Sequence, residues 1–281
     1  MRLLVTGAAG MLGRDVVAAA NNAGHDVVAV SRADLDITDA AAARAAVLDA
    51  RPDAVVNCAA WTDVDGAEGG EPAATAVNGA GAGNVAAAAA ATGALLVHVS
   101  SDYVFDGDAA EPYTEDAPTG PRSAYGRSKL AGEHAIAAAA GRSAIVRSSW
   151  LFGPHGRNFV DAMRRVGAER DEVAVVDDQI GCPTYTGHLA RALVAVAEHE
   201  LTGVLHVAGA GRCSWFDLAV ATFAETGIEC RVRPQATADL GRPAPRPAFS
   251  ALASTRADAP VLPDWREGLR AHLARVEVTT T

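Results

Sequence analysis

The sequence predicts an α/β protein built on a doubly wound parallel sheet, with a smaller second lobe toward its C-terminus. Short apolar runs alternate with Ala-rich segments in the first half, a glycine-rich turn follows the first apolar run, and the alternation loosens after Trp150. The composition agrees with this class. The 281 residues are 49 % hydrophobic and 21 % charged, which is typical of a globular chain and excludes a disordered or collagen-like one.

Five short runs in the first half are predicted to be strands. Each has four to six residues, is rich in aliphatic or β-branched side chains and carries little charge. Such near-continuous apolar runs are typical of strands that are buried on both faces of a parallel sheet. The five runs are Leu3–Thr6, Asp26–Val30, Ala54–Asn57, Leu95–Ser100 and Ala144–Arg147.

The segments between these runs have helical character. Thr38 is the expected start signal of the second helix, and the residues from Asn22 to Gly24 are the expected stop signal of the first. Repeated alternation of strand and helix implies right-handed βαβ units. The four predicted helices are Leu12–Ala23, Asp39–Ala50, Ala73–Ala91 and Tyr125–Ala139.

Residues 1–150 are predicted to form the larger lobe and residues 151–281 the smaller one, with some chain crossing back to the first. In the second part, a Pro/Arg-rich stretch at residues 242–247 precedes a last amphipathic helix near Trp265–Leu273. The other elements predicted there are the strands Val173–Val176 and Val204–Val207 and the helices Phe159–Arg170, His188–His199 and Trp215–Thr226.

Charge and apolar patterning exclude several partners. The net charge of −10 and the pI near 5.2 argue against nucleic acid, because phosphate binding needs an excess of basic surface. No apolar run approaches the roughly 20 residues of a membrane span, so no membrane partner is expected. Met1-Arg2 leads directly into apolar Leu3–Thr6 without a targeting segment, so we expect a cytoplasmic protein. The four cysteines lack metal-site spacing and are expected to be buried thiols.

A glycine-rich turn at Gly7, Gly10 and Gly13 directly follows the first predicted strand and opens the first predicted helix. Glycine permits a tight turn and a close approach of the backbone to a pyrophosphate, which binds the free N–H groups of a helix N-terminus. Met11 and Leu12 lie within this turn and are expected to contact the same ligand. The alternative is a turn that only packs a helix on a strand, but its position favours dinucleotide binding by residues 1–150.

The end of the second predicted strand is expected to select the cofactor. NAD-selective proteins of this class place an acidic residue there to bind the ribose 2′-OH, whereas this chain has Ser31 and Arg32. Ser31 can donate a hydrogen bond to a 2′-phosphate and Arg32 can pair with it, so the sequence predicts NADPH. Use of NADH stays open, because Asp34 reaches the ribose if the loop folds back.

Tyr125 and Lys129 are four residues apart in a predicted helix and therefore share one helix face. An ammonium group within about 4–6 Å lowers the pKa of a tyrosine by roughly 1–3 units, which suits Tyr125 to proton transfer. Ser101 follows a predicted strand at the sheet edge where ligands bind, and its hydroxyl can bond the oxygen that Tyr125 protonates. Alone, the pair is better explained by a surface tyrosine beside a solvated lysine; Ser101 and the glycine turn favour catalysis.

The order of these features is typical of the extended short-chain dehydrogenase/reductase superfamily, which implies a Rossmann fold for the first lobe. Within it, the chain resembles the dTDP-4-dehydrorhamnose reductase family over essentially its whole length. The resemblance to this family rests on the run Ser101–Gly107 and on later motifs. Further matching segments are residues 31–38, 51–53, 57–62, 77–78, 125–133, 147–150, 158–160, 177–184, 214–215, 246–252 and 262–266.

The resemblance implies a role for individual residues. Ser101 matches the catalytic Ser/Thr of the family, Tyr125 the catalytic acid, and Lys129 the residue that tunes Tyr125 and holds the nicotinamide ribose. The residues that match cofactor-binding positions are Asp36, Ile37, Ala59 and Ala60. The residues that match the sugar pocket are Asp102, Tyr103 and Trp150, and those associated with the nucleotide half of the substrate are Asn158, Arg246 and Ser250.

Some of these positions have a structural alternative or depart from the family. Trp150 also fits a core aromatic at a strand end. Arg246 suits bidentate binding of a diphosphate, and its alternative is a solvated arginine in a Pro-rich loop. Many relatives carry Asp at the position of Ser31, and Phe249 replaces a residue that is usually polar.

The resemblance implies NADPH-dependent reduction of the C4 ketone of dTDP-4-dehydro-6-deoxy-L-mannose to dTDP-L-rhamnose. Hydride passes from the nicotinamide to the carbonyl carbon, while Tyr125 supplies the proton and Ser101 polarises the oxygen. Two alternatives stay open: a sibling reductase of another dTDP-6-deoxyhexulose, and a non-catalytic NADP-binding regulatory subunit. Some relatives dimerise through magnesium bridged by carboxylates, so a homodimer also stays open; no ligand spacing here commits to that bridge, and we expect no metal.

Overall fold

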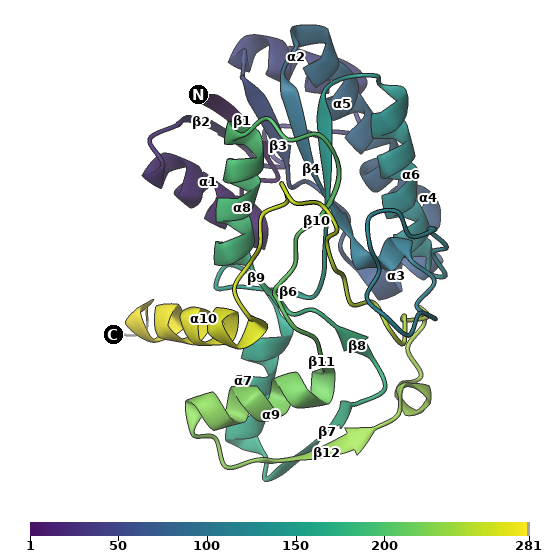
Figure 1. Ribbon diagram of the computed structural model, residues 1–281, viewed down its shortest axis with the longest axis vertical. Helices are drawn as coiled ribbons and strands as arrows, with labels where there is room; N and C mark the ends of the chain where they lie inside the picture. The colour runs from purple at the N-terminus through teal and green to yellow at the C-terminus, as the bar shows by residue number, and fades with distance from the viewer. Residues whose placement is uncertain (280–281) are drawn as a thin grey trace.

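A six-stranded parallel sheet organises the first lobe of the computed structural model, which describes residues 1–279 (Figure 1). The strand order is β10-β5-β4-β3-β1-β2, and each neighbouring pair is parallel. The order reverses between β1 and β3, which makes the sheet doubly wound and confirms the predicted fold class. The strands are β1 (Arg2–Thr6), β2 (Asp26–Val30), β3 (Ala54–Asn57), β4 (Leu95–Ser101), β5 (Ser143–Ser148) and β10 (Gly203–His206).

Helices cover both faces of this sheet. Helices α1 (Met11–Asn22) and α8 (Thr186–Glu198) pack on one face, while α2 (Ala40–Ala50), α5 (Ala82–Thr92) and α6 (Ala124–Ala138) pack on the other. The period of two along the strands divides the apolar side chains between the faces. In β1, Leu3 and Val5 join the core under α1 and α8, and Leu4 joins the core under α2 and α5.

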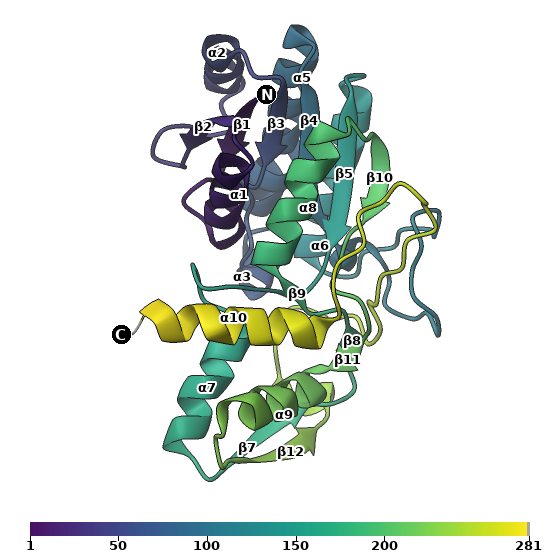
Figure 2. The same cartoon turned by 60° about the vertical axis from the view of Figure 1, so that its left-hand side comes forward.

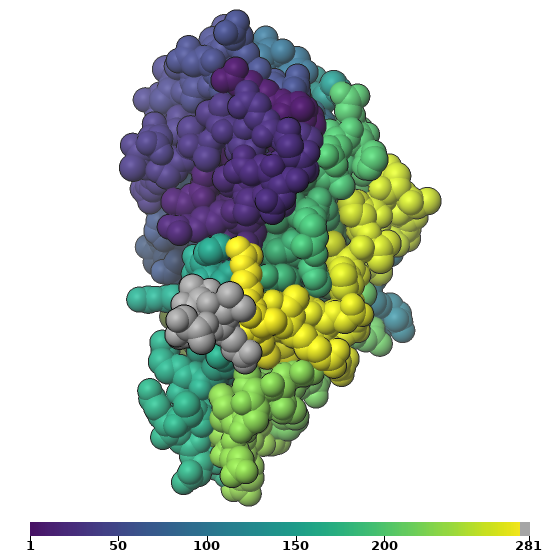
Figure 3. All heavy atoms as spheres, turned by 90° about the vertical axis from the view of Figure 1, so that its left-hand side faces the viewer, coloured from purple at the N-terminus to yellow at the C-terminus, as the bar shows by residue number. Residues whose placement is uncertain are grey.

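The second part of the chain contributes to both lobes. After β5 it builds the smaller lobe and returns to the first with α8 and β10. In the smaller lobe, β7 (Glu172–Val176) pairs in parallel with β12 (Arg231–Gln235), and α7 (Phe159–Glu169) and α9 (Trp215–Thr226) pack beside them. Helix α10 (Trp265–Thr279) lies across the boundary between the lobes (Figures 2 and 3). Short pairs complete this region: β6 (Leu151–Phe152) with β9 (Thr184–Tyr185), and β8 (Ile180–Gly181) with β11 (Cys213–Ser214).

The predicted continuous helix over Ala73–Ala91 is wrong in detail. The segment forms α4 (Glu71–Thr75), a π-helix η1 (Ala76–Gly81) and then α5. The wide π turn contains Asn78, whose side chain accepts from the Trp61 N–H at 2.8 Å and donates to the Ser128 hydroxyl at 2.9 Å. These tertiary bonds hold a local geometry that an Ala-rich sequence would not adopt by itself.

Smaller differences concern the ends of helices. Thr38 is not the cap of α2; Asp39 is, because its Oδ1 accepts from the N–H groups of Ala41 and Ala42 at 2.9 and 3.0 Å. The last helix begins at Trp265 as expected but continues to Thr279. The other predicted strands and helices agree with the structure to within two residues at each end, whereas the helix Val64–Gly69 and the strands β6, β8, β9, β11 and β12 were not predicted.

Gly132 of α6 sets how closely this helix approaches η1. A Cβ at position 132 would lie 2.1 Å from the carbonyl oxygen of Asn78, closer than any real contact. Ala at an unobstructed helix position is favoured over Gly by about 1 kcal/mol. We expect Gly132→Ala to lower the free energy of unfolding instead, by about 1–3 kcal/mol, because α6 must move away from η1.

Urea unfolding of Gly132→Ala and Gly69→Ala tests this prediction. Gly69 ends the short helix α3 (Val64–Gly69), and its Cβ would meet nothing within 4 Å. The control is expected to be neutral or slightly stabilising. Equal stability of Gly132→Ala and the wild type would contradict the prediction.

Candidate active site

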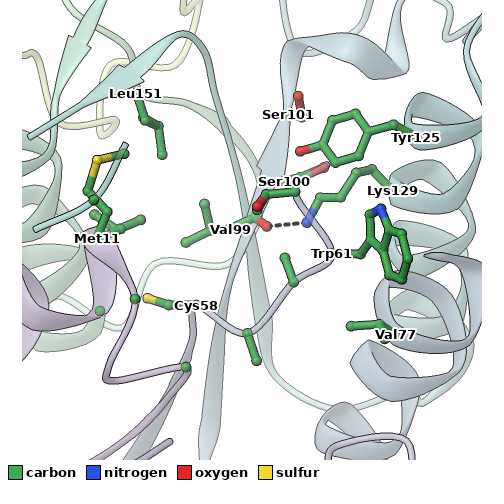
Figure 4. A pocket seen from close by; sticks show the side chains of 18 of the residues that line it. Met11, Cys58, Trp61, Val77, Val99, Ser100, Ser101, Tyr125, Lys129 and Leu151 are labelled. Carbon is green, nitrogen blue, oxygen red and sulfur yellow. Dashed lines mark hydrogen bonds between the residues drawn. The ribbon is translucent and has the colours of Figure 1, made fainter. Parts of the chain in front are cut away.

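A cavity of about 970 Å³ lies at the carboxyl edge of the sheet, between the first lobe and the loops of the second (Figure 4). It includes the switch point between β1 and β3, where ligands bind in doubly wound sheets. Most of the predicted site residues meet in this cavity. Those that line it are Gly7, Gly10, Met11, Leu12, Gly13, Arg32, Asp36, Ile37, Ala59, Ala60, Ser101, Asp102, Tyr103, Tyr125, Lys129 and Trp150.

The glycine turn has the shape that a dinucleotide requires. Gly7 has φ +66°, and a Cβ there would lie 2.6 Å from the backbone nitrogen of Ala59. A Cβ at Gly13 would lie 2.2 Å from the Gly7 carbonyl oxygen, so the turn packs tightly on itself. Helix α1 begins after Gly10 without a side-chain cap, which leaves its first N–H groups facing the cavity for an anion. These residues fit the pyrophosphate of a nicotinamide dinucleotide.

The end of β2 differs from the expected arrangement. The Ser31 hydroxyl and N–H both donate to Oδ2 of Asp34, at 2.6 and 2.9 Å, so the hydroxyl is already bonded within the loop. Ser31 is not among the residues that line the cavity, whereas Arg32 is. These hydrogen bonds hold the pKa of the Asp34 carboxyl below its usual value. Arg32 is therefore the residue of this loop that is available to a 2′-phosphate.

Ser101, Tyr125 and Lys129 come from two neighbouring elements. Ser101 ends β4 and caps the short 3-10 helix η2 (Asp102–Val104), where its Oγ accepts from the Tyr103 N–H at 3.2 Å. Tyr125 and Lys129 lie in the first two turns of α6, whose N-cap Ser123 accepts from the Gly126 N–H. The Nζ of Lys129 donates to the carbonyl oxygen of Val99 at 2.7 Å. Figure 4 shows the Tyr125 hydroxyl pointing into the cavity between Ser101 and Lys129.

The expected lowering of the Tyr125 pKa is not what the structure shows. Burial against the cavity wall raises the pKa of Tyr125 to about 12, and a hydrogen bond with the Ser101 side chain acts in the opposite direction. The Lys129 ammonium group is bonded to Val99 rather than to the phenol and is not among the groups that shift this pKa. Tyr125 is therefore protonated near neutral pH, which is the form that a proton donor needs.

Lys129 is almost completely buried, with 2 % of its surface exposed. Burial lowers the pKa of Lys129 to about 8, and the nearby Glu133 acts against this effect. An ammonium group with this pKa carries its charge at neutral pH and loses it in mildly alkaline solution.

Asp102 and Tyr103 lie beside this group. Asp102 is 2 % exposed; its Oδ1 accepts from the Ser101 hydroxyl at 3.0 Å, and burial raises the pKa of the carboxyl to about 6. Oδ2 of Asp102 and the hydroxyl of Ser250 are both buried, and the Ser250 side chain acts on the Asp102 carboxyl against the effect of burial. The Tyr103 ring packs edge-on against Tyr125 at 5.5 Å. Asp102 and Tyr103 thus place polar side chains in the cavity wall.

Asn158, Arg246 and Ser250 do not line the cavity. Asn158 is the N-cap of α7, and its side chain is bonded to Gly153, Gly156 and Asp161. Arg246 forms a bidentate ion pair with Asp65 of α3, at 2.7 and 3.0 Å. The structure therefore gives Asn158 a local role and places Arg246 in a bridge between the second lobe and α3.

Trp215 lines the cavity and was missed as a site residue. Its ring stacks face to face on that of Trp150, with 3.6 Å between centroids, and its Nε1 donates to Gln179 at 3.1 Å. Trp150 has φ +48°, a left-handed conformation that is rare for a bulky residue and often found at functional sites. The paired tryptophans form a flat apolar wall. The signal in the sequence was the segment Ser214-Trp215, which matched the family without an assigned role.

The described residues lack two features, a membrane-spanning helix and a metal-binding cluster. None of their helices combines the length and hydropathy needed to cross a membrane. They contain no group of three or more His, Cys, Asp or Glu side chains that could hold a metal ion.

The chain has many relatives of known name. A dTDP-4-dehydrorhamnose reductase of Mycobacterium tuberculosis is 47 % identical over 283 residues, covering 97 % of this chain and 92 % of that protein. A dTDP-4-keto-6-deoxy-D-glucose reductase of Streptomyces niveus is 48 % identical over 253 residues, covering 89 % and 88 %. The solved dTDP-4-dehydrorhamnose reductase of Bacillus anthracis, in complex with NADP, superposes with a TM-score of 0.95 at 38 % identity, covering 98 % and 99 %.

The family model described as RmlD substrate binding domain matches residues 1–278. This match spans both lobes, the glycine turn and the Ser101, Tyr125 and Lys129 group. The family expected from the sequence is confirmed: the chain belongs to the RmlD family, that of the dTDP-4-dehydrorhamnose reductases.

Proposed function

We propose that this protein reduces the C4 ketone of dTDP-4-dehydrorhamnose to dTDP-L-rhamnose with NADPH. The observation that carries this function is the meeting of Ser101, Tyr125 and Lys129 with the glycine turn in one cavity. Relatives at 46–47 % identity are named for this reaction, and a similar solved structure contains NADP. The bound NADPH would supply the hydride.

The chain's own residues divide the remaining work. The glycine turn and the start of α1 hold the pyrophosphate, and Lys129 is placed to hold the nicotinamide ribose. Ser101 donates a hydrogen bond to the carbonyl oxygen and so polarises the carbonyl group. Tyr125 gives its proton to the same oxygen, because its raised pKa keeps the phenol protonated until that oxygen becomes basic.

The substrate half of the site is also a proposal. Asp102 and Tyr103 bind the sugar, and the Trp150/Trp215 pair forms the apolar wall against it. Arg246 is proposed to contact the diphosphate while Asp65 holds its guanidinium in place. We further propose that the protein works in the cytoplasm; a homodimer stays a prediction, which light scattering of the purified protein checks.

Turnover by the purified protein tests the function. We expect oxidation of NADPH at 340 nm with dTDP-4-dehydrorhamnose, and a lower kcat/KM with dTDP-4-keto-6-deoxyglucose. A preference for the second sugar would favour a sibling reductase. No turnover of either sugar by protein that binds NADPH would favour a regulatory subunit.

Tyr125→Phe is expected to lower kcat by about 10²–10⁴-fold, because it removes the proton donor and keeps the ring. NADPH binding, followed by cofactor fluorescence, should stay within about threefold of the wild type. The control is Tyr113→Phe, since Tyr113 bonds Asp106 outside the cavity. A Tyr125→Phe enzyme that retained more than about a tenth of the wild-type kcat would exclude the assigned role.

The preference for NADPH is expected to depend on Arg32. Wild-type kcat/KM should be higher with NADPH than with NADH, and Arg32→Ala should reduce this preference about tenfold, mainly through the KM of NADPH. Arg44→Ala on α2 is the control, because Arg44 lies outside this cavity. If the wild type used NADH as well as NADPH, the role given to Arg32 would be wrong.

Asp102 is expected to bind substrate at the expense of stability. Its pKa is raised from 3.8 to about 6, so the native state loses stability as the pH rises through this range and the carboxyl ionises. Asp102→Asn removes that ionisation. The variant should gain up to about 3 kcal/mol of unfolding free energy at pH 7.5 and little at pH 4, while its KM for the sugar rises.

Urea unfolding at the two pH values measures this difference. The comparison is Asp106→Asn. Hydrogen bonds lower the pKa of Asp106, so replacing its carboxylate should destabilise the protein at pH 7.5. A gain for Asp102→Asn that was the same at both pH values would show that ionisation is not its cause.

A further inference from the structure

A buried ion pair joins Glu133 of α6 to Arg147 of β5 and takes no part in the mechanism above. Glu133 and Arg147 are each 5 % exposed. The Arg147 Nε donates to Glu133 Oε1 at 2.9 Å and its Nη2 to Oε2 at 2.7 Å, and the Ser100 hydroxyl donates to Oε1 at 2.6 Å. Burying two charges is costly, so a pair at this place needs an explanation.

The position of Glu133 connects it to the catalytic group. Tyr125, Lys129 and Glu133 are spaced four residues apart along α6, so they form a line on one face of the helix. Two adjacent residues of β4 form hydrogen bonds with Lys129 and Glu133. Val99 accepts from the Lys129 Nζ, and Ser100 donates to Glu133.

Of the other titratable groups near Lys129, Asp102 is charged near pH 7 because its pKa is about 6, but it is not among the groups that act on Lys129. The remaining groups are neutral or positive. Burial raises the pKa of the Cys58 thiol, after β3, to about 12, and lowers that of His98, on β4, far below its usual value, so both are neutral near pH 7. Tyr125 on α6 is protonated as well. Arg147 on β5 adds a positive charge behind Glu133. Burial lowers the pKa of Lys129, and the Glu133 carboxylate opposes this effect and favours the charged ammonium form.

We propose that Glu133, fixed by Arg147 and Ser100, is a positioning residue that keeps the buried Lys129 ammonium group charged during catalysis. It acts on the ribose and on Tyr125 only through Lys129. This inference deepens the proposed function and rests on it for the link to catalysis. The charge on Lys129 itself can be measured without substrate or cofactor.

Lys129 is the only lysine in the 281-residue sequence, since the other 23 of the 24 Lys+Arg residues are arginines. Protein produced with ¹³Cε-lysine therefore has one side-chain lysine signal when no tag supplies another. Its NMR titration reports the pKa of Lys129 directly. In cofactor-free Glu133→Gln, we expect this pKa to fall by about one unit or more, because the nearby opposite charge is lost.

The same shift should appear in the pH profile of the enzyme. At pH 6 the ammonium group stays charged in both proteins, and kcat of Glu133→Gln should be close to the wild type. At pH 8.5 a one-unit lower pKa leaves about eightfold less charged Lys129, and kcat/KM for NADPH should fall to match. If Glu133 had a merely structural role, Glu133→Gln would lower kcat and kcat/KM by the same factor at pH 6 and at pH 8.5.

Glu133→Gln leaves Arg147 buried without a charged partner, so the variant can be too unstable to study. The double variant Glu133→Gln/Arg147→Met removes both charges and is expected to fold. Its Lys129 pKa should also fall, because Glu133 is among the groups that act on the charge of Lys129 and Arg147 is not. The control is Asp15→Asn, which alters another buried carboxylate that pairs with an arginine, here the partly exposed Arg275, on the opposite face of the sheet.

The outcomes separate the two proposals. A Lys129 pKa that falls in the Glu133 variants and stays constant in Asp15→Asn supports the inference. An unchanged Lys129 pKa in both Glu133 variants overturns it, whatever their activity. If the pKa falls but the wild type reduces no dTDP-sugar, the proposed function fails while Glu133 still controls the charge on Lys129.

Discussion

The burial of one ammonium group at the end of β4 is the constraint on which the site depends. Lys129 must be close enough to the sheet to bond the Val99 carbonyl, so α6 has to lie tightly against β4. The side chain loses its hydration there, and its charge survives only if the protein supplies compensating groups. Helix packing, strand register and buried charge around Lys129 all follow from this requirement.

The packing of α6 meets this requirement through small residues and a distorted neighbour. Gly132 permits contact with the Asn78 carbonyl, and η1 widens at that point so that Asn78 can bond Ser128 on α6. Asn78 also bonds the backbone of Trp61, which lines the cavity. Asn78 therefore fixes both the position of α6 against η1 and the position of Trp61 in the cavity wall.

Local patterns allowed much of the fold and half of the site to be predicted. The strands appear as apolar runs, the glycine turn as a spacing, and Tyr125 and Lys129 as an i, i+4 pair, because each depends on residues close in sequence. The π-helix and the Arg246–Asp65 bridge could not be predicted from local patterns. The π-helix is held by a bond between residues 50 apart in sequence, and the bridge joins residues 181 apart. The Tyr125 pKa was predicted in the wrong direction, because spacing reveals a neighbouring charge but not the depth of burial.

The two carboxyl groups near Tyr125 show how environment separates residues of the same chemistry. Glu133 accepts three hydrogen bonds, one from Ser100 and two from Arg147. Asp102 is acted on by the hydroxyls of Ser101 and Ser250, but burial prevails and raises its pKa to about 6. The charge of Glu133 is thus balanced inside the protein, where it can act on Lys129. Asp102 instead lines the cavity, where we propose that it meets a hydroxyl of the sugar.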